Sequence, residues 1–306
     1  MITQTRNLYS LSNDIDFNLE ELLPIKLPSR VLLCTPEYFN VSDPKNAHMK
    51  NGDTIDKQLA TEQWNNLKKI YLNLAEKKVI NSLKIINGWK DCEDMVFCAN
   101  QTFTWIKDDK KFAVMANMKH SSRQKEVLYF EQFFTGMGYE ICKLKPGIFF
   151  EAMGDAIPLP GKQLIFLGHG FRSSVNAAKE LGKLLDVKVV TLKLVNELFY
   201  HLDTCFIPLN CHTTLIVKEA FDTDSFNVIK CLFKEVIEIP NIEALNFSLN
   251  AHCFYTNQGN KIAIIHKGSP ITVSILKENN YTVYEINTSE FMKSGGSVFC
   301  MKLAYY

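Results

Sequence analysis

The sequence predicts a mixed α+β chain, built as one domain from five similar strand-and-helix units. Five segments repeat apolar residues at helical spacing, and two or three short strand-like runs lie between successive helices. No linker or low-complexity segment divides the 306 residues, which are enough to bury a sizeable core. No repeat is visible residue by residue, so the units resemble one another only in their order of elements.

The first half of the chain begins with a polar, irregular stretch, 1–29, which we expect to form a loose N-terminal arm ahead of a domain spanning 30–306. The first strand is expected at Arg30–Cys34, and a loop rich in turn residues follows it. Apolar residues at three- and four-residue spacing indicate a helix that starts near Asp56. Beyond it we expect a strand at 94–100, a hairpin turning at 107–111, a helix after Ser121 and Ser122, and a strand at 139–144.

The second half continues the same alternation. Helices are expected to begin at Ser173 or Ser174 and at Asp224, because these side chains can cap a helix N-terminus. A last short helix opens at Thr288 and ends at a Gly-Gly pair, since glycine readily adopts the left-handed backbone that ends a helix. Strands are expected at 163–167, 187–194, 199–206, 236–239 and 261–266.

Charge and cysteine content narrow the class of function. The 34 basic and 33 acidic residues nearly cancel, so nothing favours nucleic acid or an anionic membrane as a partner. The nine cysteines include no Cys-x-x-Cys pair, which favours free thiols in a reducing compartment over disulfides or a metal site. The N-terminus lacks the apolar core of a signal peptide, and no apolar run reaches membrane-spanning length. We therefore expect a cytoplasmic protein.

The stretch 199–206 combines aromatic and apolar residues with two titratable groups, His201 and Asp203. If the stretch is a strand, its side chains alternate and these two groups project to the same face. A histidine beside a carboxylate can act as a general acid or base. The alternative is a histidine hydrogen-bonded inside the core, with the aspartate at the end of a strand, and the stretch by itself favours neither.

Three further polar clusters interrupt apolar surroundings: Glu151 with Asp155, Arg172 at a loop-to-helix junction, and Cys300 after a Gly-Gly turn. Each has a structural alternative, because the acids can close a turn, the arginine can pair with a surface acid, and the cysteine can be an inert buried thiol. Together with His201 they suit nucleophilic attack on a cationic substrate. Carboxylates would hold the cation, the thiolate would attack it, and the histidine would move protons.

These clusters, in this order, resemble the pentein superfamily of guanidine-modifying enzymes: arginine deiminases, dimethylarginine dimethylaminohydrolases, amidinotransferases and arginine dihydrolases. The resemblance covers 30–303 and is carried by four motifs: Phe150-Glu-Ala-Met-Gly-Asp155, Gly168-x-Gly-Phe-Arg172-Ser, Tyr200-His-Leu-Asp-Thr-Cys-Phe206 and Gly295-Gly-x-x-x-Cys300. It implies a pseudo-five-fold α/β propeller, in which five strand-strand-helix-strand units surround a central site. That fold agrees with the five units expected from the pattern.

The resemblance also implies roles for individual residues. Cys300 matches the nucleophile, His201 the general acid and base, and Glu151 a carboxylate that grips the guanidinium. The matched substrate-binding residues are Asp94 and Asp203 around the guanidinium, with Arg172 and Arg123 at the substrate's α-carboxylate, which suits a bidentate arginine. Asp155 is expected to be a structural acid of its turn. No metal or cofactor is implied, the partner is a small guanidino substrate, and the chain is a monomer or a homo-oligomer.

Two details point to the arginine dihydrolase branch. Asn100 ends the motif Asp94-x-Val-Phe-x-Ala-Asn100, where deiminases and dimethylaminohydrolases carry aspartate, and an amide can bond a cationic guanidine and a neutral urea alike. Asn46 lies in a loop that resembles the substrate loop of that branch. The implied reaction converts arginine to ornithine, ammonia and carbon dioxide through a covalent amidino-cysteine intermediate. Deiminase, dimethylarginine dimethylaminohydrolase and amidinotransferase reactions remain as alternatives on the same scaffold.

Four positions depart from the family pattern: Ala47, Cys98, Gln101 and Phe299 stand where proline, threonine, alanine and a basic residue are usual. Loss of the basic residue before Cys300 would raise the pKa of the thiol. A non-catalytic arginine-binding relative is therefore the alternative from a different class, and Phe299 is its best support.

Overall fold

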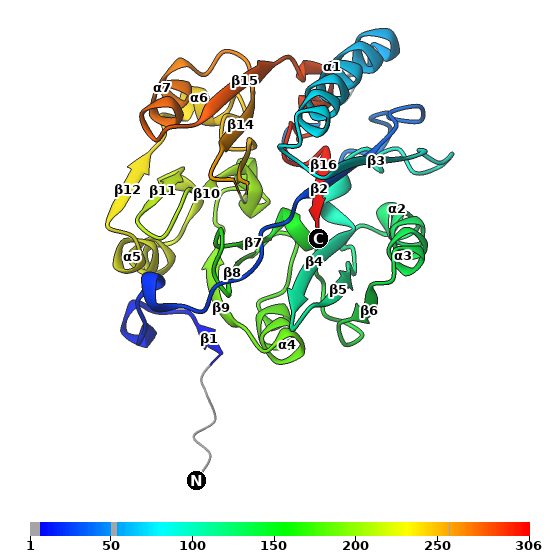
Figure 1. Cartoon of the computed structure of the whole chain (residues 1–306). Helices are drawn as coiled ribbons and strands as arrows, with labels where there is room; N and C mark the ends of the chain where they lie inside the picture. Colours follow the sequence, from blue (N-terminus) through cyan, green and yellow to red (C-terminus); the bar gives the residue numbers. More distant parts are fainter. Residues whose placement is uncertain (1–6, 50–53, 257) are drawn as a thin grey trace.

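The computed structural model describes residues 7–49, 54–256 and 258–306. Within these ranges the chain forms five β-sheets, and Figure 1 shows the helices at the periphery with the sheets nearer the centre. The mixed α/β class expected from the sequence is confirmed. No helix in these ranges is long and apolar enough to cross a membrane.

One order of elements recurs in the sheets: two antiparallel strands, a helix, and a third strand parallel to the second. In one unit β4 (Thr102–Lys107) and β5 (Lys110–Met115) form the expected hairpin, and β6 (Glu140–Lys143) pairs in parallel with β5. A parallel pair needs a crossover connection, which α3 (Glu126–Gly136) provides. Phe130 of α3 is fully buried, so the crossover helix also covers apolar surface.

The same order holds in three more units. One comprises β7 (Ala156–Pro158), β8 (Leu164–His169), α4 (Asn176–Leu185) and β9 (Lys188–Lys193). The next comprises β10 (Phe206–Pro208), β11 (Thr213–Ile216), α5 (Thr223–Leu232) and β12 (Glu235–Glu238). The third comprises β13 (His252–Tyr255), β14 (Lys261–His266), α7 (Pro270–Glu278) and β15 (Thr282–Ile286). The short helices α2 (Ser121–Gln124), α6 (Asn241–Ala244) and α8 (Ser289–Met292) lie in connections.

The remaining sheet joins the two ends of the domain. The C-terminal strand β16 (Lys302–Tyr305) pairs antiparallel with β2 (Arg30–Cys34), and β3 (Ser82–Ile86) pairs in parallel with β2 after α1 (Lys57–Glu76). Because β16 begins just after Cys300, the sheet that joins the ends of the domain also positions that cysteine.

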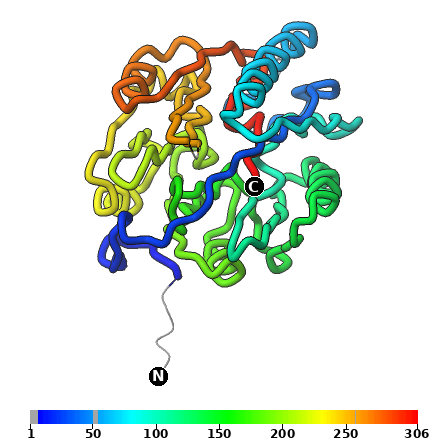
Figure 2. Tube along the Cα trace, viewed as in Figure 1, coloured from blue at the N-terminus to red at the C-terminus, as the bar shows by residue number. Residues whose placement is uncertain are grey.

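Residues 7–29, the described part of the segment expected to be a loose arm, are packed against the rest of the chain, which corrects the expectation that they are loose. β1 (Leu8–Tyr9) adds an edge strand parallel to β9, and Tyr9 is fully buried. The chain then crosses the face of the molecule, as Figure 2 shows, and backbone hydrogen bonds hold it at Ile25 and Ser29. A few apolar anchors therefore order a segment whose overall composition is polar. Residues 1–6 lie outside the described ranges.

Two expected strands are wrong. Residues 94–100 form turns and a short 3-10 helix, and residues 199–206 contain the 3-10 helix Leu202–Thr204 before β10 begins. Both stretches are almost entirely buried. A continuous apolar run that is buried on all sides does not reveal whether its backbone is extended or turning.

The helix starts also differ in detail. Asp222 rather than Asp224 caps α5, accepting from the backbone N–H of Ser225 at 2.9 Å. α4 has no side-chain cap, and Ser173 instead accepts a hydrogen bond from the backbone of Glu151. The sequence pattern does not predict α7, in which four of the nine residues are β-branched and weaken the helical signal.

Candidate active site

Cys300 lies in the turn before β16, and its thiol is held from two sides. Its Sγ is 3.2 Å from Asp203 Oδ2 and 3.1 Å from Asn250 Nδ2. Asn250 Oδ1 also accepts from the backbone N–H of Cys300 at 3.3 Å, so one buried amide fixes both parts of the residue. The sequence reading missed Asn250, whose only signal was a single amide between the apolar residues Leu249 and Ala251.

The surroundings of the thiol favour its protonated form. Burial raises the pKa of Cys300 well above its ordinary value, and the Asp203 carboxylate raises it further. Burial likewise raises the pKa of Asp203 to about 7. A cation placed beside this pair would lower both pKa values and favour the thiolate.

Glu151 links the histidine to an arginine. Its Oε2 accepts from His201 Nε2 at 2.7 Å and from Arg172 Nη1 at 3.0 Å, and all three side chains are buried. Burial alone would raise the pKa of Glu151, but the charges of Arg172 and His201 outweigh it and hold that pKa well below its usual range. The ionised carboxylate therefore fixes the imidazole with a proton on Nε2.

Asp155 holds the turn that carries His201 and Asp203. Its Oδ1 accepts from the backbone N–H of Leu202 at 3.2 Å, and its Oδ2 accepts from that of Ser173 at 3.1 Å. Because this turn is not a strand, His201 and Asp203 do not share a face as expected: the first bonds a carboxylate, and the second faces the thiol. Both groups nevertheless lie at the site, and Asp155 supports the backbone around them.

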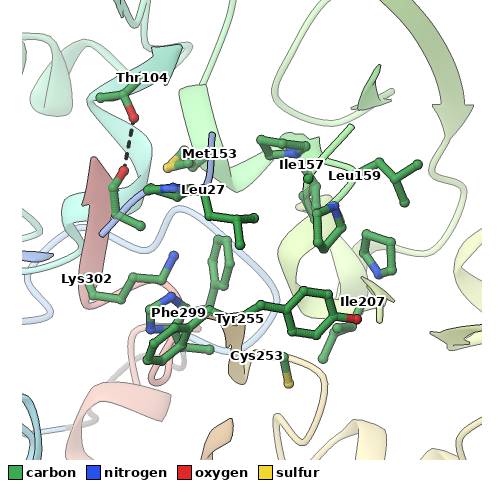
Figure 3. Close-up of a pocket in the computed structure, with 18 of the residues that line it drawn as sticks. Leu27, Thr104, Met153, Ile157, Leu159, Ile207, Cys253, Tyr255, Phe299 and Lys302 are labelled. Atoms are coloured by element: carbon green, nitrogen blue, oxygen red, sulfur yellow. Dashed lines mark hydrogen bonds between the residues drawn. The ribbon is translucent and has the colours of Figure 1, made fainter. Parts of the chain in front are cut away.

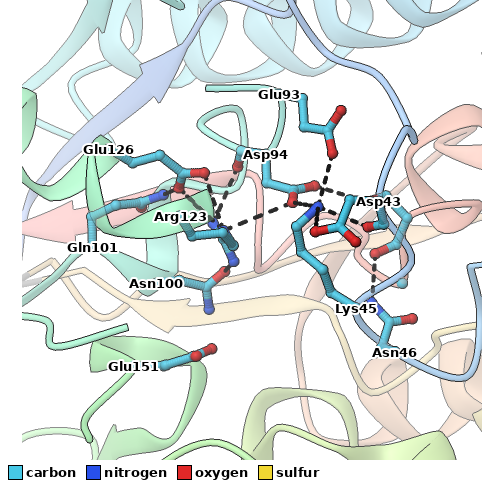
Figure 4. Close-up of polar contacts among 12 residues, drawn as sticks. Asp43, Lys45, Asn46, Glu93, Asp94, Asn100, Gln101, Arg123, Glu126 and Glu151 are labelled. Atoms are coloured by element: carbon cyan, nitrogen blue, oxygen red, sulfur yellow. Dashed lines mark hydrogen bonds and ion pairs between the residues drawn. The ribbon is translucent and has the colours of Figure 1, made fainter. Parts of the chain in front are cut away.

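Arg123 is buried and already paired (Figure 4). Its Nη2 donates to Glu126 Oε2 at 2.9 Å and to the backbone carbonyl of Asp94 at 3.2 Å. Its Nη1 donates to Asn100 Oδ1 at 3.0 Å. Arg123 therefore orients Asn100, whose Nδ2 has no hydrogen-bond partner in the described part of the chain.

Lys45 places an ammonium among the same groups (Figure 4), and the sequence reading does not identify it. Its Nζ is 3.1 Å from Asp94 Oδ2 and 2.8 Å from Glu93 Oε1, and its side chain is 1% exposed. Burial would lower the pKa of Lys45, but these carboxylates raise it above its ordinary value. Asp94 thus holds a cation that belongs to the protein itself. In the sequence, a lysine within a polar loop looks like any surface lysine.

Asn46 joins this loop to the glycine turn before Cys300. Its Nδ2 donates to the backbone carbonyl of Ser294 at 3.0 Å. Gly295 has a φ of +81°, and a Cβ there would lie 2.7 Å from Asn46 Oδ1. Only glycine accommodates both the left-handed backbone and the close approach of the asparagine.

These side chains surround one pocket, which we call the front pocket. Its lining includes six of the predicted site residues: Asn46, Asp94, Asn100, Arg123, Arg172 and Cys300. The other three, Glu151, His201 and Asp203, reach this lining through the contacts to Arg172 and Cys300 described above. The structure thus brings a thiol, a histidine, carboxylates and arginines to one place.

Comparison with known proteins identifies the family. A family model described as N,N dimethylarginine dimethylhydrolase, eukaryotic, matches residues 35–305. The chain belongs to this family. This dimethylarginine dimethylhydrolase family member is 32% identical over 277 residues to the bifunctional arginine dihydrolase/ornithine cyclodeaminase ArgZ of Synechocystis sp.. It is 33% identical over 277 residues to the bifunctional arginine dihydrolase/ornithine cyclodeaminase AgrE of Nostoc sp..

Each of these matches covers 90% of the family member but 37% of the relative, so it spans little more than a third of those proteins. A crystal structure of the N-terminal domain of ArgZ, covalently bound to a reaction intermediate, is similar with a TM-score of 0.81 and 31% identity. That similarity covers 90% of this chain and 97% of the ArgZ domain. The family member therefore shares its overall fold with that domain.

Proposed function

We propose that this protein is a cysteine-dependent hydrolase of arginine or a close guanidino compound, of the dihydrolase type. The observation that carries the proposal is the contact of the Cys300 thiol with Asp203, beside the buried Glu151–His201 pair. Two relatives are named as arginine dihydrolases, and the similar ArgZ domain is bound to a covalent reaction intermediate.

In the first half of the reaction, the substrate guanidinium enters beside Asp203 and Cys300. Its positive charge lowers the pKa of the thiol, which passes its proton to Asp203 Oδ2 at 3.2 Å, and the thiolate attacks the guanidine carbon. His201 donates a proton to the departing nitrogen, so ammonia leaves and an amidino-thioether of Cys300 remains. Glu151 stabilises the imidazolium and keeps the ring in position.

In the second half, His201 takes a proton from water, and the resulting hydroxide attacks the amidino carbon. The carbon–sulfur bond breaks, which restores the thiolate and yields a ureido product. A second round on that product would release another ammonia and form a carbamoyl-thioether of Cys300. Water then releases a carbamate, which decomposes to carbon dioxide and ornithine.

The second hydrolysis needs a hydrogen-bond donor for the neutral ureido carbonyl, and Asn100 can provide one. Arg123 occupies the Oδ1 of Asn100, which leaves Nδ2 as a donor without a hydrogen-bond partner in the described residues. A neutral ureido carbonyl can accept from such a donor, whereas a carboxylate at this position could only accept. The available Nδ2 donor of Asn100 favours the dihydrolase reaction over a single hydrolysis.

We further propose that the five sheets form the blades of a pseudo-five-fold α/β propeller with the front pocket between them. The catalytic domain would span 30–306 and the N-terminal arm 1–29, of which the described residues 7–29 pack on the outside of the domain. The near-balance of 34 basic and 33 acidic residues supports a small guanidino substrate rather than nucleic acid or a membrane surface as the partner. The cysteine-rich, disulfide-free chain favours the cytoplasm as its location.

Hydrolysis of dimethylarginine is the second candidate, and the family match favours it. A non-catalytic role has less support, because Phe299 lines a different cavity from Cys300 and leaves the front pocket clear. Product analysis separates the candidates. The protein is incubated with L-arginine or asymmetric dimethylarginine, and ammonia, citrulline, ornithine and dimethylamine are measured together. Ornithine from arginine supports the proposal, whereas citrulline alone, or dimethylamine from the methylated substrate as the main product, overturns it.

Substitution of Cys300 tests the covalent step. Cys300→Ser should lower kcat on the order of a thousandfold or more, because the hydroxyl is a far weaker nucleophile. Cys231→Ser is the matched control, since Cys231 is an exposed cysteine on α5. Wild-type turnover by the Cys300 variant would contradict the mechanism, and mass spectrometry of acid-quenched wild-type protein should find the amidino adduct on Cys300.

A further inference from the structure

A second cavity lies behind the catalytic cysteine, and its volume is about 110 Å³. We call it the back pocket. Apolar side chains dominate its walls, including Leu27, Ile157, Ile207, Tyr255 and Phe299 (Figure 3). Leu27 belongs to the N-terminal arm, whose backbone is held on either side at Ile25 and Ser29, so the arm forms one wall of the cavity.

The lining of this cavity includes three cationic residues, of which Lys302 is buried, Lys26 is exposed and Arg30 donates to the backbone carbonyl of Tyr306. Lys302 is 1% exposed, and Figure 3 shows its amine directed into the space beside Phe299. Its Nζ lies 3.2 Å from the centre of the Phe299 ring. Across the described ranges its Nζ makes no hydrogen bond or ion pair, although the backbone N–H of Lys302 donates to the backbone carbonyl of Phe299, and a buried ammonium without an anion is costly. Burial lowers the pKa of Lys302 to about 7.

Asp203 also lines the back pocket, so it lies between the two cavities. Its Oδ2 faces the Cys300 thiol at 3.2 Å, while its Oδ1 is buried and has no hydrogen-bond partner in the described part of the chain. The inner end of an apolar cavity thus carries one ammonium and one carboxyl oxygen that both lack a direct partner. When Asp203 is protonated it offers a second donor, and its raised pKa makes that form accessible near neutral pH.

We propose that the back pocket is a second binding site, which takes a small monocarboxylate with a short apolar body. The Lys302 ammonium would pair with the carboxylate, and the hydrocarbon would lie against Phe299, Ile207 and Leu27. A cavity of roughly 150 Å³ can hold a molecule the size of benzene. The volume of about 110 Å³ here is smaller, but the cavity is not enclosed, so the end of a short chain can extend towards the exposed Lys26. At pH 6, below the pKa values of about 7 of both groups, Lys302 is charged and Asp203 is protonated. Under that condition an anion pairs with the ammonium, a neutral molecule gains only contacts with the walls, and a cation is repelled.

Three probes with the same hydrocarbon chain test the proposal: hexanoate, 1-hexanol and hexylamine. Since Arg172 and Arg123 in the front pocket could also attract a carboxylate, titration calorimetry is done at pH 6 on wild type and on Cys300→Ser saturated with L-arginine. We expect hexanoate to bind both proteins, roughly tenfold or more tightly than hexanol, and hexylamine not to bind. Competition between hexanoate and arginine, or equal binding of hexanoate and hexanol, would overturn the proposal. The comparison among probes needs no variant of the back pocket.

Two lysines of the same cavity provide a matched pair of variants. Lys302→Met should remove the preference for hexanoate over hexanol, whereas Lys26→Met should leave it unchanged, because Lys26 is a rim residue that is 69% exposed. Ile207→Trp should fill the cavity and abolish binding of both probes. Hexanoate binding that survives in Lys302→Met, or that is lost in Lys26→Met instead, would contradict the assignment. If the wild-type protein does not turn over arginine, the proposed reaction is wrong, but the proposal of a binding site in the back pocket is not affected.

Discussion

The charged side chains of the front pocket are each held by a partner within the chain. Lys45 pairs with Asp94, Arg123 with Glu126, and Arg172 with Glu151. A charged group of the substrate must therefore replace one member of such an ion pair, because these side chains already have partners. An exchange loses less free energy than the burial of new charges, because the groups are already desolvated.

Lys45 is the clearest case, because its ammonium pairs with Asp94, the carboxylate that the family resemblance places beside the substrate's guanidinium. Lys45→Met should lower the KM for arginine several-fold and leave kcat nearly unchanged, since the competing cation is removed. Steady-state kinetics measure both constants. Lys45→Arg is the control, and it should keep the KM high because the charge is retained. A rise of KM in Lys45→Met would show instead that the lysine binds the substrate's carboxylate.

Asn100 should control how many hydrolyses occur. Asn100→Asp adds a carboxylate that strengthens the hold on a cationic guanidinium but gives a neutral ureido group no comparable gain. We expect the product to shift from ornithine towards citrulline, which would leave before the second attack. The ratio of the two products in a single incubation measures the effect. An unchanged ratio would move the choice to another group, of which Asn46 in the neighbouring loop is the first to test.

At the scale of elements, tight turns rather than strands position the reacting groups. Gly154 ends the 3-10 turn Ala152–Gly154, and a Cβ there would lie 2.4 Å from Asn100 Nδ2 and 3.2 Å from His201 Nδ1. Two site residues from different units therefore meet over a single glycine.

Gly154→Ala should displace both residues and lower kcat about a hundredfold, with a smaller effect on thermal stability. Gly136→Ala is the matched control, because Gly136 ends α3 and a Cβ there would meet nothing within 4 Å. Kinetics and thermal unfolding of both variants check this expectation. Equal activity of the two variants would show that the close approach at Gly154 can relax.

Some helices, strands and turns of this fold can be predicted from the sequence pattern, and others cannot. α1 and the β4–β5 hairpin are predictable, because one has an apolar face at helical spacing and the other has a polar turn between strands. The 3-10 turns at Cys98–Asn100 and Leu202–Thr204 are not, because burial on all sides removes any periodic signal. Polar clusters in apolar surroundings singled out five of the nine site residues, and the resemblance to motifs of a known family supplied the other four and the roles of all nine. Lys45 and Asn250 lacked such motifs, and only their long-range contacts give them a place at the site.

At the scale of the whole molecule, buried ionisable groups from different sheets meet behind the front pocket. Lys302 comes from β16, which joins the chain ends, and Asp203 precedes β10. Burial lowers the pKa of Lys302 to about 7 and raises the pKa of Asp203 to about 7. Because both groups bind protons differently in the folded and unfolded chain, the stability of the whole fold depends on pH through them.

Lys302→Met should therefore stabilise the protein, and more at pH 6 than at pH 9. The folded pKa of Lys302 is depressed from 10.5 to about 7, so wild type loses stability as pH falls across that window and loses no more below it. Methionine removes this loss, and the difference in gain between the two pH values should be up to about 3 kcal/mol. Removal of the cation also raises the pKa of Asp203 further, which penalises the variant only at the higher pH and acts in the same direction. Urea unfolding at both pH values measures the effect, with Lys26→Met as the exposed control. A gain that is equal at both pH values would show that Lys302 keeps its charge at no expense to the fold, and would place an anion beside it in the free protein.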